Sequence, residues 1–502
     1  MECKLQYGYE TIGEKLFSGT IEKPIDLDFT LPDYCADIQK ILKCNIKPII
    51  MAKSVSGEKL EMEGIVSVRV FYLDSIGKEL RFCEKAIPFS VNTSLKRAAL
   101  SPIIIADIKT QYINCRAVSS RRLDIHGAFS INASVYDNGK FEFVKRIDED
   151  TVEQKEQNIT LSELCVAATH QFMLSNTLET GSSKPVVENI IRSSEQVRID
   201  DIRNVSGTMI IRGNLIVSIL YSSGIENMNL EKIEYEIPFN ESVETSCNEN
   251  NAIIKVNAQV CDVEIKVKSD NVGENSIISL DAKIVCEILA YKDKEITALS
   301  DAFSREYETN IEFKPVNISH IKEHIHKNEQ TVSNLKIENG DIDKIIDIWN
   351  ENCSIKYEDE NLLAKYNVCL LYRNKEEKIC YIEKTLDFTY PISTKEKTEA
   401  RGKVLNIEAK VKSPEDIEIK TDIEMDYDVL SENVYKILSK LFEDEDSKKN
   451  KPNNSLCIYF ASEGESVWEI AKEHLCSIND IKTENMLIED YIKEAQTLII
   501  SI

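Results

Sequence analysis

The chain is poor in the residues and motifs from which most active sites are built. Its 502 residues include only six histidines. The fourteen cysteines form no C-x-x-C pair, which leaves zinc ribbons and thioredoxin-like redox centres without support. The glycines form neither G-x-x-x-x-G-K-(S/T) nor G-x-G-x-x-G, the loops that cradle nucleotide phosphates. We therefore predict that the protein is not an enzyme and holds no cofactor and no metal.

Positive charge and long apolar runs are also scarce. Against 86 acidic residues stand 61 lysines and arginines, which gives a formal net charge of −25. Such an excess disfavours nucleic acids and anionic membranes as partners. The most apolar early stretch, residues 46–52, is far shorter than the ~20 residues that cross a bilayer. Residues 1–10 lack the apolar core of a secretion signal, so we expect a cytoplasmic protein with reduced thiols and no membrane insertion.

What the sequence does contain is an internal repeat. Apolar side chains alternate along residues 60–72, 209–221 and 360–372, and each stretch ends on a tyrosine. The three tyrosines are spaced by about 150 residues, and a small residue stands eight positions before each of them: Gly64, Gly213 and Ala364. Alternation with period two predicts a half-buried antiparallel strand in each copy.

The repeat continues on both sides of these strands. Ile87-Pro88-Phe89 recurs as Ile237-Pro238-Phe239 and, more weakly, as Leu386-Asp387-Phe388. A later strand pair recurs at residues 123–136, 277–291 and 417–427. Apolar residues three and four positions apart predict a short helix before each strand, the first capped by Asp33. These residues are Ile38, Ile41 and Leu42; Val187, Ile190 and Ile191; and Ile342, Ile345 and Ile346.

A period of this length gives each copy room for its own core. We therefore predict a mainly β protein with three tandem β-rich modules, each a sandwich or open barrel with one short helix. The expected boundaries are 1–150, 151–318 and 319–442 for the modules, 443–454 for a flexible linker and 455–502 for a C-terminal domain. Residues 175–184 and 319–334 are expected to be connections, and Ser431 to cap a helix that carries Val434, Ile437, Leu438, Leu441 and Phe442.

Three histidines cluster in the second of these connections. On a helix, His320 and His324 would share a face and could hold a metal together with His326. They do not form the H-E-x-x-H motif, and the surrounding residues are polar. A solvated connector is therefore favoured over a metal site.

The last 48 residues predict the order strand, helix, helix, strand. Ser466 and Glu469 have the S-x-x-E spacing of a capping box at the start of a helix. Apolar residues then follow on one helical face, Ser477 can cap a second helix, and residues 496–500 close as a strand. This arrangement, together with the turn Glu463-Gly464-Glu465-Ser466-Val467-Trp468, resembles a LysM domain.

Residues 30–42 resemble the opening motif of a module from clostridial spore proteins. Tandem copies followed by a LysM-like domain resemble the SipL-like family of clostridial spore-envelope morphogenetic proteins. The resemblance implies a scaffold in the mother-cell cytoplasm at the forespore surface, where the spore coat assembles. It further implies that the LysM-like domain docks onto the ATPase that forms the basement layer of the coat, with other coat proteins as further partners.

The binding residues that the resemblance implies lie on two loops. In glycan-binding LysM domains the sugar lies between the strand-to-helix loop and the loop before the last strand, which correspond to residues 462–467 and 486–491. Here Glu494-Ala495 replaces the usual Pro-Gly, although Gln496 remains. Exposed apolar side chains on these loops would suit a protein partner, whereas a retained glycan site would make the chain a peptidoglycan-binding protein of the cortex or cell wall. The candidate binding residues are Glu463, Gly464, Glu465, Ser466, Val467, Trp468, Met486, Leu487, Ile488 and Tyr491.

Two questions about these candidates stay open at this point. Leu487 and Ile488 could fill the small core of the domain instead of facing a partner. Trp468 has the same ambiguity, since its position suggests the core while a partly exposed indole would suit an interface.

Overall fold

The structure is a computed structural model. It describes residues 2–76, 79–181, 184–223, 229–245, 247, 251–337, 341–448 and 456–501. This part of the chain is mainly β, as the alternation predicts, and its two α-helices both lie near the C-terminus. No helix among the described residues is long and apolar enough to cross a membrane.

The first module is a sandwich of two three-stranded antiparallel sheets. Its strands are β1 (Leu5–Thr30), β2 (Ile38–Ser56), β3 (Lys59–Asp74), β4 (Leu80–Ser94), β5 (Ile103–Ala117) and β6 (Arg122–Ile147). The sheet orders are β2-β3-β4 and β1-β6-β5. Buried side chains from both sheets form one core, in which Phe89 of β4 meets Phe129 of β6 edge to face at 4.9 Å between ring centroids.

The second and third modules repeat this topology. The second contains β7 (Val152–Glu179), β8 (Asn189–Val205), β9 (Thr208–Ser223), β10 (Asn229–Glu244), β11 (Ile253–Lys268) and β12 (Ile277–Ser304). The third contains β13 (Glu308–Lys336), β14 (Ile342–Glu358), β15 (Asn361–Asn374), β16 (Ile379–Pro391), β17 (Lys397–Ser413) and β18 (Asp416–Asp444). Each has two three-stranded sheets in the same order and its own core, so the repeat seen in the sequence is a repeat of structure.

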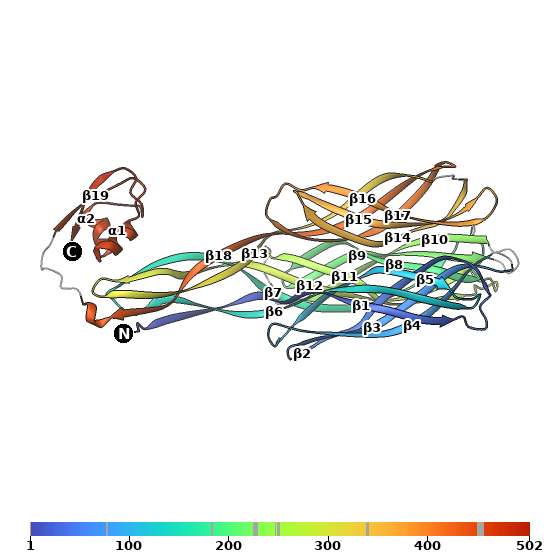
Figure 1. The fold of residues 1–502 in the computed structure, drawn as a ribbon, viewed down its shortest axis with the longest axis horizontal. Helices are drawn as coiled ribbons and strands as arrows, with labels where there is room; N and C mark the ends of the chain where they lie inside the picture. The colour runs from blue at the N-terminus through green and yellow to red at the C-terminus, as the bar shows by residue number, and fades with distance from the viewer. Residues whose placement is uncertain are drawn as a thin grey trace.

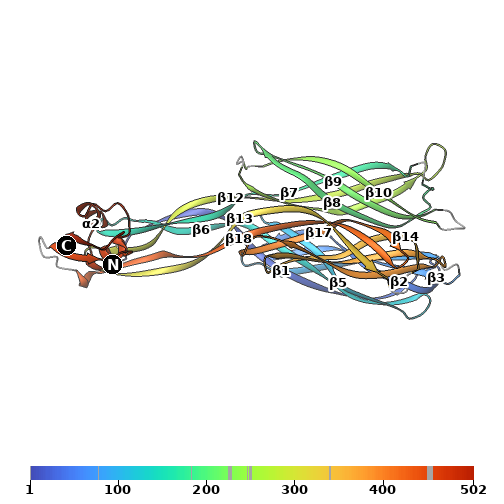
Figure 2. The same ribbon diagram turned by 90° about the horizontal axis from the view of Figure 1, so that it is seen from above.

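The three modules lie side by side, and their longest strands extend together beyond the sandwiches as a stalk (Figures 1 and 2). The stalk consists of three antiparallel strand pairs, β1–β6, β7–β12 and β13–β18. Each pair joins the first and last strands of a module, and these strands are 26 to 29 residues long. Its interior is apolar and draws on all three modules. One cluster near the tip contains Val144, Ile147, Leu299, Ala302, Leu438 and Leu441.

A second shared cluster holds the sandwiches together. Phe71, Leu220 and Leu371 each precede the tyrosine that ends the repeated strand, and all three are buried in this cluster. Equivalent residues of the three copies thus meet at one place, as in a threefold arrangement. The modules have separate cores, yet their association buries a continuous series of apolar contacts between them.

The short helices predicted before the repeated strands are wrong. Ile38, Ile41 and Leu42 lie on β2, whose pairing with β3 shifts between Ile38 and Lys40 and again between Ile41 and Lys43. Each shift is a β-bulge that adds one residue to the strand and resets which face the next side chain takes. The bulges therefore give a strand the spacing of a helix. The same shift recurs before Arg192 of β8 and Asp347 of β14, and Asp33 lies in a turn.

The helix predicted after Ser431 is also wrong, because these residues belong to β18. Its register shifts between Leu438 and Lys440, so Leu438 and Leu441 both face the stalk interior although they are three residues apart. The polar residues 319–334 lie within β13, and the boundary expected at 318/319 divides that strand. Residues 308–318 pair with β18 of the third module.

The other expected connections are shorter than the sequence predicts. Strand β7 continues to Glu179, well into residues 175–184, of which 182 and 183 lie outside the described residues. Of the linker expected at 443–454, residues 443 and 444 complete β18, and a 3-10 helix, η1 (Glu445–Ser447), follows. Residues 449–454, together with Ser455, lie outside the described residues.

The C-terminal domain follows with β19 (Leu456–Ala461), α1 (Val467–His474), α2 (Ile478–Glu484) and β20 (Gln496–Ser501). The two strands pair antiparallel, and the helices pack on one face of this small sheet around buried Ile470, Ala471, Ile481 and Leu498. The domain lies beside the end of the stalk (Figure 1).

Candidate binding surface of the C-terminal domain

The start of α1 is organised differently from a capping box. Ser466 occupies the N-cap position, but its side chain accepts no capping hydrogen bond. Its backbone instead forms a β-bridge with Tyr491, which lies in the loop before β20. At the second helix the prediction is confirmed, since the Ser477 hydroxyl oxygen accepts from the Asp480 amide at 3.3 Å.

Three backbone hydrogen bonds join the two loops that carry the candidate residues. The Gly464 amide donates to the Ile492 carbonyl at 2.8 Å, and the Ile492 amide donates to the Glu465 carbonyl at 2.9 Å. The Val467 amide donates to the Asp490 carbonyl at 2.9 Å. Gly464 adopts φ +86°, a left-handed conformation that glycine reaches without steric cost. The structure thus brings residues 462–467 and 486–491 together as one surface.

The second loop presents large apolar side chains to solvent. Met486 is 89% exposed, Ile488 94% and Tyr491 59%. Leu487 instead packs against the core of the domain. The sequence left open whether Leu487 and Ile488 fill the core or face a partner. In the structure Leu487 packs against the core, whereas Ile488 faces solvent.

Two of the candidate residues are not available on this surface. Val467 is 1% exposed and belongs to the core. Trp468 is 5% exposed, and its indole lies against the stalk, where it packs on Phe303 and donates from Nε1 to Asp301 at 2.9 Å. Glu463 and Gly464 are exposed, while Glu465 and Ser466 are half-buried. A partner bound to the loops would therefore contact neither the valine nor the indole.

Sequence reasoning missed a second apolar patch on the same domain. Leu456, Ile458, Phe460 and Ile499 are all exposed on the face of the β19–β20 sheet opposite the helices, with Ile458 paired to Ile499 across the strands. Tyr459 and Ala461 alternate with them and point toward the helices. The sequence of β19 is apolar at almost every position, so both faces of this strand are apolar. The two helices of the domain can cover only one face of the β19–β20 sheet.

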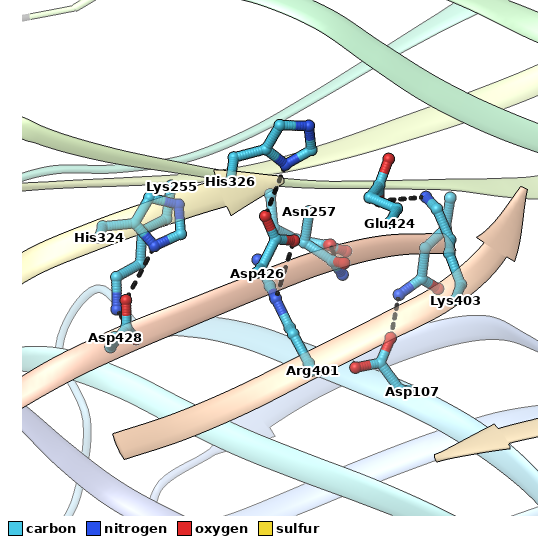
Figure 3. A network of polar contacts seen from close by, with 12 residues as sticks. Asp107, Lys255, Asn257, His324, His326, Arg401, Lys403, Glu424, Asp426 and Asp428 are labelled. Atoms are coloured by element: carbon cyan, nitrogen blue, oxygen red, sulfur yellow. Dashed lines mark hydrogen bonds and ion pairs between the residues drawn. The ribbon is translucent and has the colours of Figure 1, made fainter. Parts of the chain in front are cut away.

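The three clustered histidines lie on β13 and not in a solvated connector. His324 Nδ1 is 2.8 Å from Asp428 Oδ1 and His326 Nδ1 is 2.7 Å from Asp426 Oδ1 (Figure 3). His320 is 3.2 Å from both Ser162 and Asp293. Each histidine thus has a separate carboxylate partner, and no metal-binding group among the described residues includes any of them.

The polar network around these histidines joins all three modules. Arg401 of β17 contacts Asp426 and Lys255 of β11 contacts Asp428 (Figure 3). Asp107 of β5 accepts a hydrogen bond from the Gln259 side-chain amide of β11 at 3.0 Å. Burial alone would raise the pKa of Asp426, but the hydrogen bond with His326 and the charge of Arg401 outweigh it and lower this pKa. Opposite charges compensate one another across the network, which suits a structural junction.

Among the residues that the structure describes, one group of side chains has the spacing of metal ligands: Glu351, Cys369 and Glu383. Lys43 of the first module already lies between its two carboxylates, at 3.0 Å from Glu351 and 2.7 Å from Glu383. Burial disfavours the ammonium, but Glu351 and Glu383 outweigh that effect and raise the pKa of Lys43. The lysine supplies the positive charge that a metal ion would bring, and the group connects the first and third modules.

Comparison with known proteins identifies one domain family. Residues 37–118 and 186–272 match the family described as SipL, SPOCS domain. These segments contain β2 to β5 of the first module and β8 to β11 of the second, the same four strands of each copy. No curated protein and no solved structure matches the chain. The two matches support a SipL-like spore protein.

Proposed function

We propose that this chain is a non-enzymatic scaffold of spore coat assembly whose C-terminal domain docks onto the morphogenetic ATPase of the coat basement layer. The sporulation role is supported by the two SPOCS-domain matches. The docking role is supported by the resemblance of the last 48 residues to a LysM domain. The scaffold works in the mother-cell cytoplasm at the forespore surface, and its β modules engage other coat proteins.

The observation that carries this proposal is the exposed loop of Met486, Ile488 and Tyr491. Isolated exposed apolar side chains are ordinary, but three large ones on a single loop suit the buried centre of a protein interface. The loop is fixed to its neighbour by backbone hydrogen bonds, so docking would cost little conformational entropy. Glu489 and Asp490 pair with Lys493 and Lys482, but the domain still has more acidic than basic residues, which favours a partner with a basic surface.

The test compares the two apolar patches of the domain in the full-length chain. One variant carries Met486→Ser, Ile488→Ser and Tyr491→Ser, and the matched control carries Ile458→Ser, Phe460→Ser and Ile499→Ser. We expect the loop variant to lose co-purification with the coat ATPase and the sheet-face variant to retain it. Loss only in the sheet-face variant would move the docking surface to the β19–β20 sheet.

Retention in both variants would contradict docking through this domain. Sedimentation with insoluble peptidoglycan then decides the remaining alternative. A C-terminal domain that pellets with peptidoglycan, and binds the ATPase in neither form, would indicate a glycan-binding role at the cortex or cell wall.

A further inference from the structure

The C-terminal domain contacts the stalk mainly through one face of α1, and the Ile478 amide at the start of α2 also donates to Glu153 of β7. Trp468 and Lys472 lie four residues apart and therefore on the same side of α1. The Trp468 indole meets the Phe303 ring edge to face, at 5.2 Å between ring centroids. Asp301 receives both polar groups: the indole Nε1–H donates to Oδ2 at 2.9 Å, and Lys472 Nζ lies 2.7 and 2.9 Å from its two oxygens.

This contact is buried, and the indole N–H has its hydrogen-bond acceptor within it. Phe303 is 1% exposed and clusters with the core residues of the C-terminal domain, not with the core of its own module. Lys155, on the strand paired with Asp301, places its ammonium 5.7 Å from the centre of the indole ring, within reach of a cation–π interaction. An aromatic pair, a hydrogen bond and an ion pair thus act on the same two residues of α1.

The repeat provides an internal comparison for this surface. In each strand pair of the stalk the register shifts once near the tip, and the shift skips one residue: Lys145, Ser300 or Ser439. These three residues occupy equivalent positions in the three modules. Because the three bulges are equivalent, the residues that follow them in one module can be matched one by one with those of the other two modules. The positions of Asp301 and Phe303 are held by Arg146 and Asp148 in the first module and by Lys440 and Phe442 in the third.

Of the three equivalent faces, the one on the second module alone combines a carboxylate with an aromatic ring at these positions. Arg146 and Lys440 would repel Lys472 and could not accept a hydrogen bond from the indole. The face that α1 occupies is therefore the one whose chemistry complements it.

We propose that Asp301 and Phe303 form a specific receptor for α1 of the same chain, which latches the C-terminal domain onto the second module. In the latched state Trp468 is hidden and the loop of Met486, Ile488 and Tyr491 stays exposed. A partner that needs the indole side must first displace the latch, whereas a partner of the loop need not. The latch does not rest on the proposed function, because it concerns a different face of the domain.

The chain contains only two tryptophans, which makes Trp468 a convenient reporter. In a Trp349→Phe background all indole fluorescence comes from Trp468. We expect blue-shifted emission that acrylamide quenches poorly. Asp301→Lys, which gives the second module the charge of the third, and Phe303→Ala should each shift the emission to the red and raise the quenching constant severalfold.

The matched controls are Lys440→Ala and Phe442→Ala on the equivalent face of the third module, which should leave emission and quenching unchanged. Should Trp349→Phe perturb the fold, as judged by far-ultraviolet circular dichroism, 19F spectra of the chain labelled with 5-fluorotryptophan report both indoles separately. The proposal is overturned if Trp468 is quenched equally before and after Asp301→Lys, or if the control variants release it as well. Sedimentation should show a monomer, and a dimer that dissociates on Asp301→Lys would mean that the receptor binds α1 of a second copy instead.

Discussion

At the scale of single residues, two recurring features of the sequence explain each other. Gly64 and Gly213 lie directly across the sheet from Phe89 and Phe239, the phenylalanines of the Ile-Pro-Phe motif. A Cβ added to Gly64 would lie 2.0 Å from the Ile49 carbonyl oxygen and 2.7 Å from the Phe89 ring. The missing side chain thus makes room for a neighbouring strand and for the ring, which covers the gap left by the glycine.

We therefore expect Gly64→Ala to destabilise the first module by about 1–3 kcal/mol, since the new methyl group must displace backbone and not only a flexible side chain. Urea unfolding followed by circular dichroism measures the change. Gly19→Ala is a suitable control, because the nearest atoms to its new Cβ belong to the movable Phe17 ring at 3.0 Å. Equal stability of the two variants would show that the close approach at Ile49 is not a constraint.

A buried ion pair provides a second test at the residue scale. Arg192 of the second module and Asp347 of the third lie at equivalent positions of the repeat and contact each other at 2.8 Å. Their side chains are 8% and 0% exposed. Removing the carboxylate would leave the guanidinium buried without its partner, which typically costs about 3–5 kcal/mol.

Asp347→Ala should therefore lower the thermal unfolding midpoint strongly, whereas the double variant Arg192→Met, Asp347→Leu should recover most of the loss. Calorimetry on the two variants separates the charge from the packing. A double variant as unstable as the single one would show that shape, and not the unpaired charge, determines the loss.

At the scale of elements, strands without bulges could be predicted from the sequence, whereas several strands with bulges were mistaken for helices. Strands β3, β9 and β15 alternate along most of their length, and their positions and core-facing residues followed directly from the sequence. Near their ends consecutive residues are buried, because Phe71, Leu220 and Leu371 face the junction between the modules. Strands β2, β8 and β14 contain bulges, so two adjacent apolar residues, such as Ile41 and Leu42, serve the sandwich core and the junction between modules respectively. An apolar pattern with period two cannot show that adjacent residues are buried on opposite faces, because the cluster that buries Leu42 includes residues of the other modules.

Bulges also affected the alignment of the strand pair at residues 123–136, 277–291 and 417–427. Bulge positions place Leu430 of β18, and not Tyr427, at the position of Tyr136 and Tyr291. The candidate loops could be predicted because they belong to one contiguous stretch of chain. The burial of Trp468 could not, since Asp301 and Phe303 precede it by a whole module and carry no motif of their own.

Strand β13 allows a prediction about pH. The hydrogen bond with Asp426 raises the pKa of His326, which Asp426, Glu424 and Lys403 all face, and the pKa of Asp426 is lowered as described above. A histidine with a raised pKa adds stability that is complete below its unfolded value of about 6.5 and is lost as pH rises through the folded value. A carboxylate with a lowered pKa adds stability above about 3.9 that is lost as pH falls.

The pair should therefore contribute most to stability between these limits, near pH 5 to 6. We expect the thermal midpoint to fall as pH rises from 6 to 8, and His326→Asn to reduce this slope. Because the His326 side chain is 36% exposed, the effect should be small. A slope unchanged by the substitution would show that other groups titrate in this range; Lys403→Gln serves as a control that alters a neighbouring charge without removing the imidazole.

At the scale of the whole molecule, the three modules bury apolar side chains against one another, whereas the C-terminal domain covers little of their surface. The clusters between modules run from the junction at Phe71, Leu220 and Leu371 to the stalk tip at Ile147, Ala302 and Leu441. Each cluster takes side chains from every module. The contact of the C-terminal domain with the stalk, in contrast, centres on Asp301 and Phe303.

Two truncations should therefore behave in opposite ways. Deletion of residues 455–502 should leave the modules folded, with an unfolding midpoint close to that of the full chain, because it uncovers little more than Phe303. Deletion of the third module with everything after it, residues 308–502, should expose apolar faces along the whole stalk and at the junction. We expect the two-module product to bind a hydrophobic dye, to associate and to be cleaved by protease within β6 and β12. A soluble, monomeric and protease-resistant two-module fragment would show instead that each sandwich is stable alone, and that the stalk is an assembly of modules that fold before they meet.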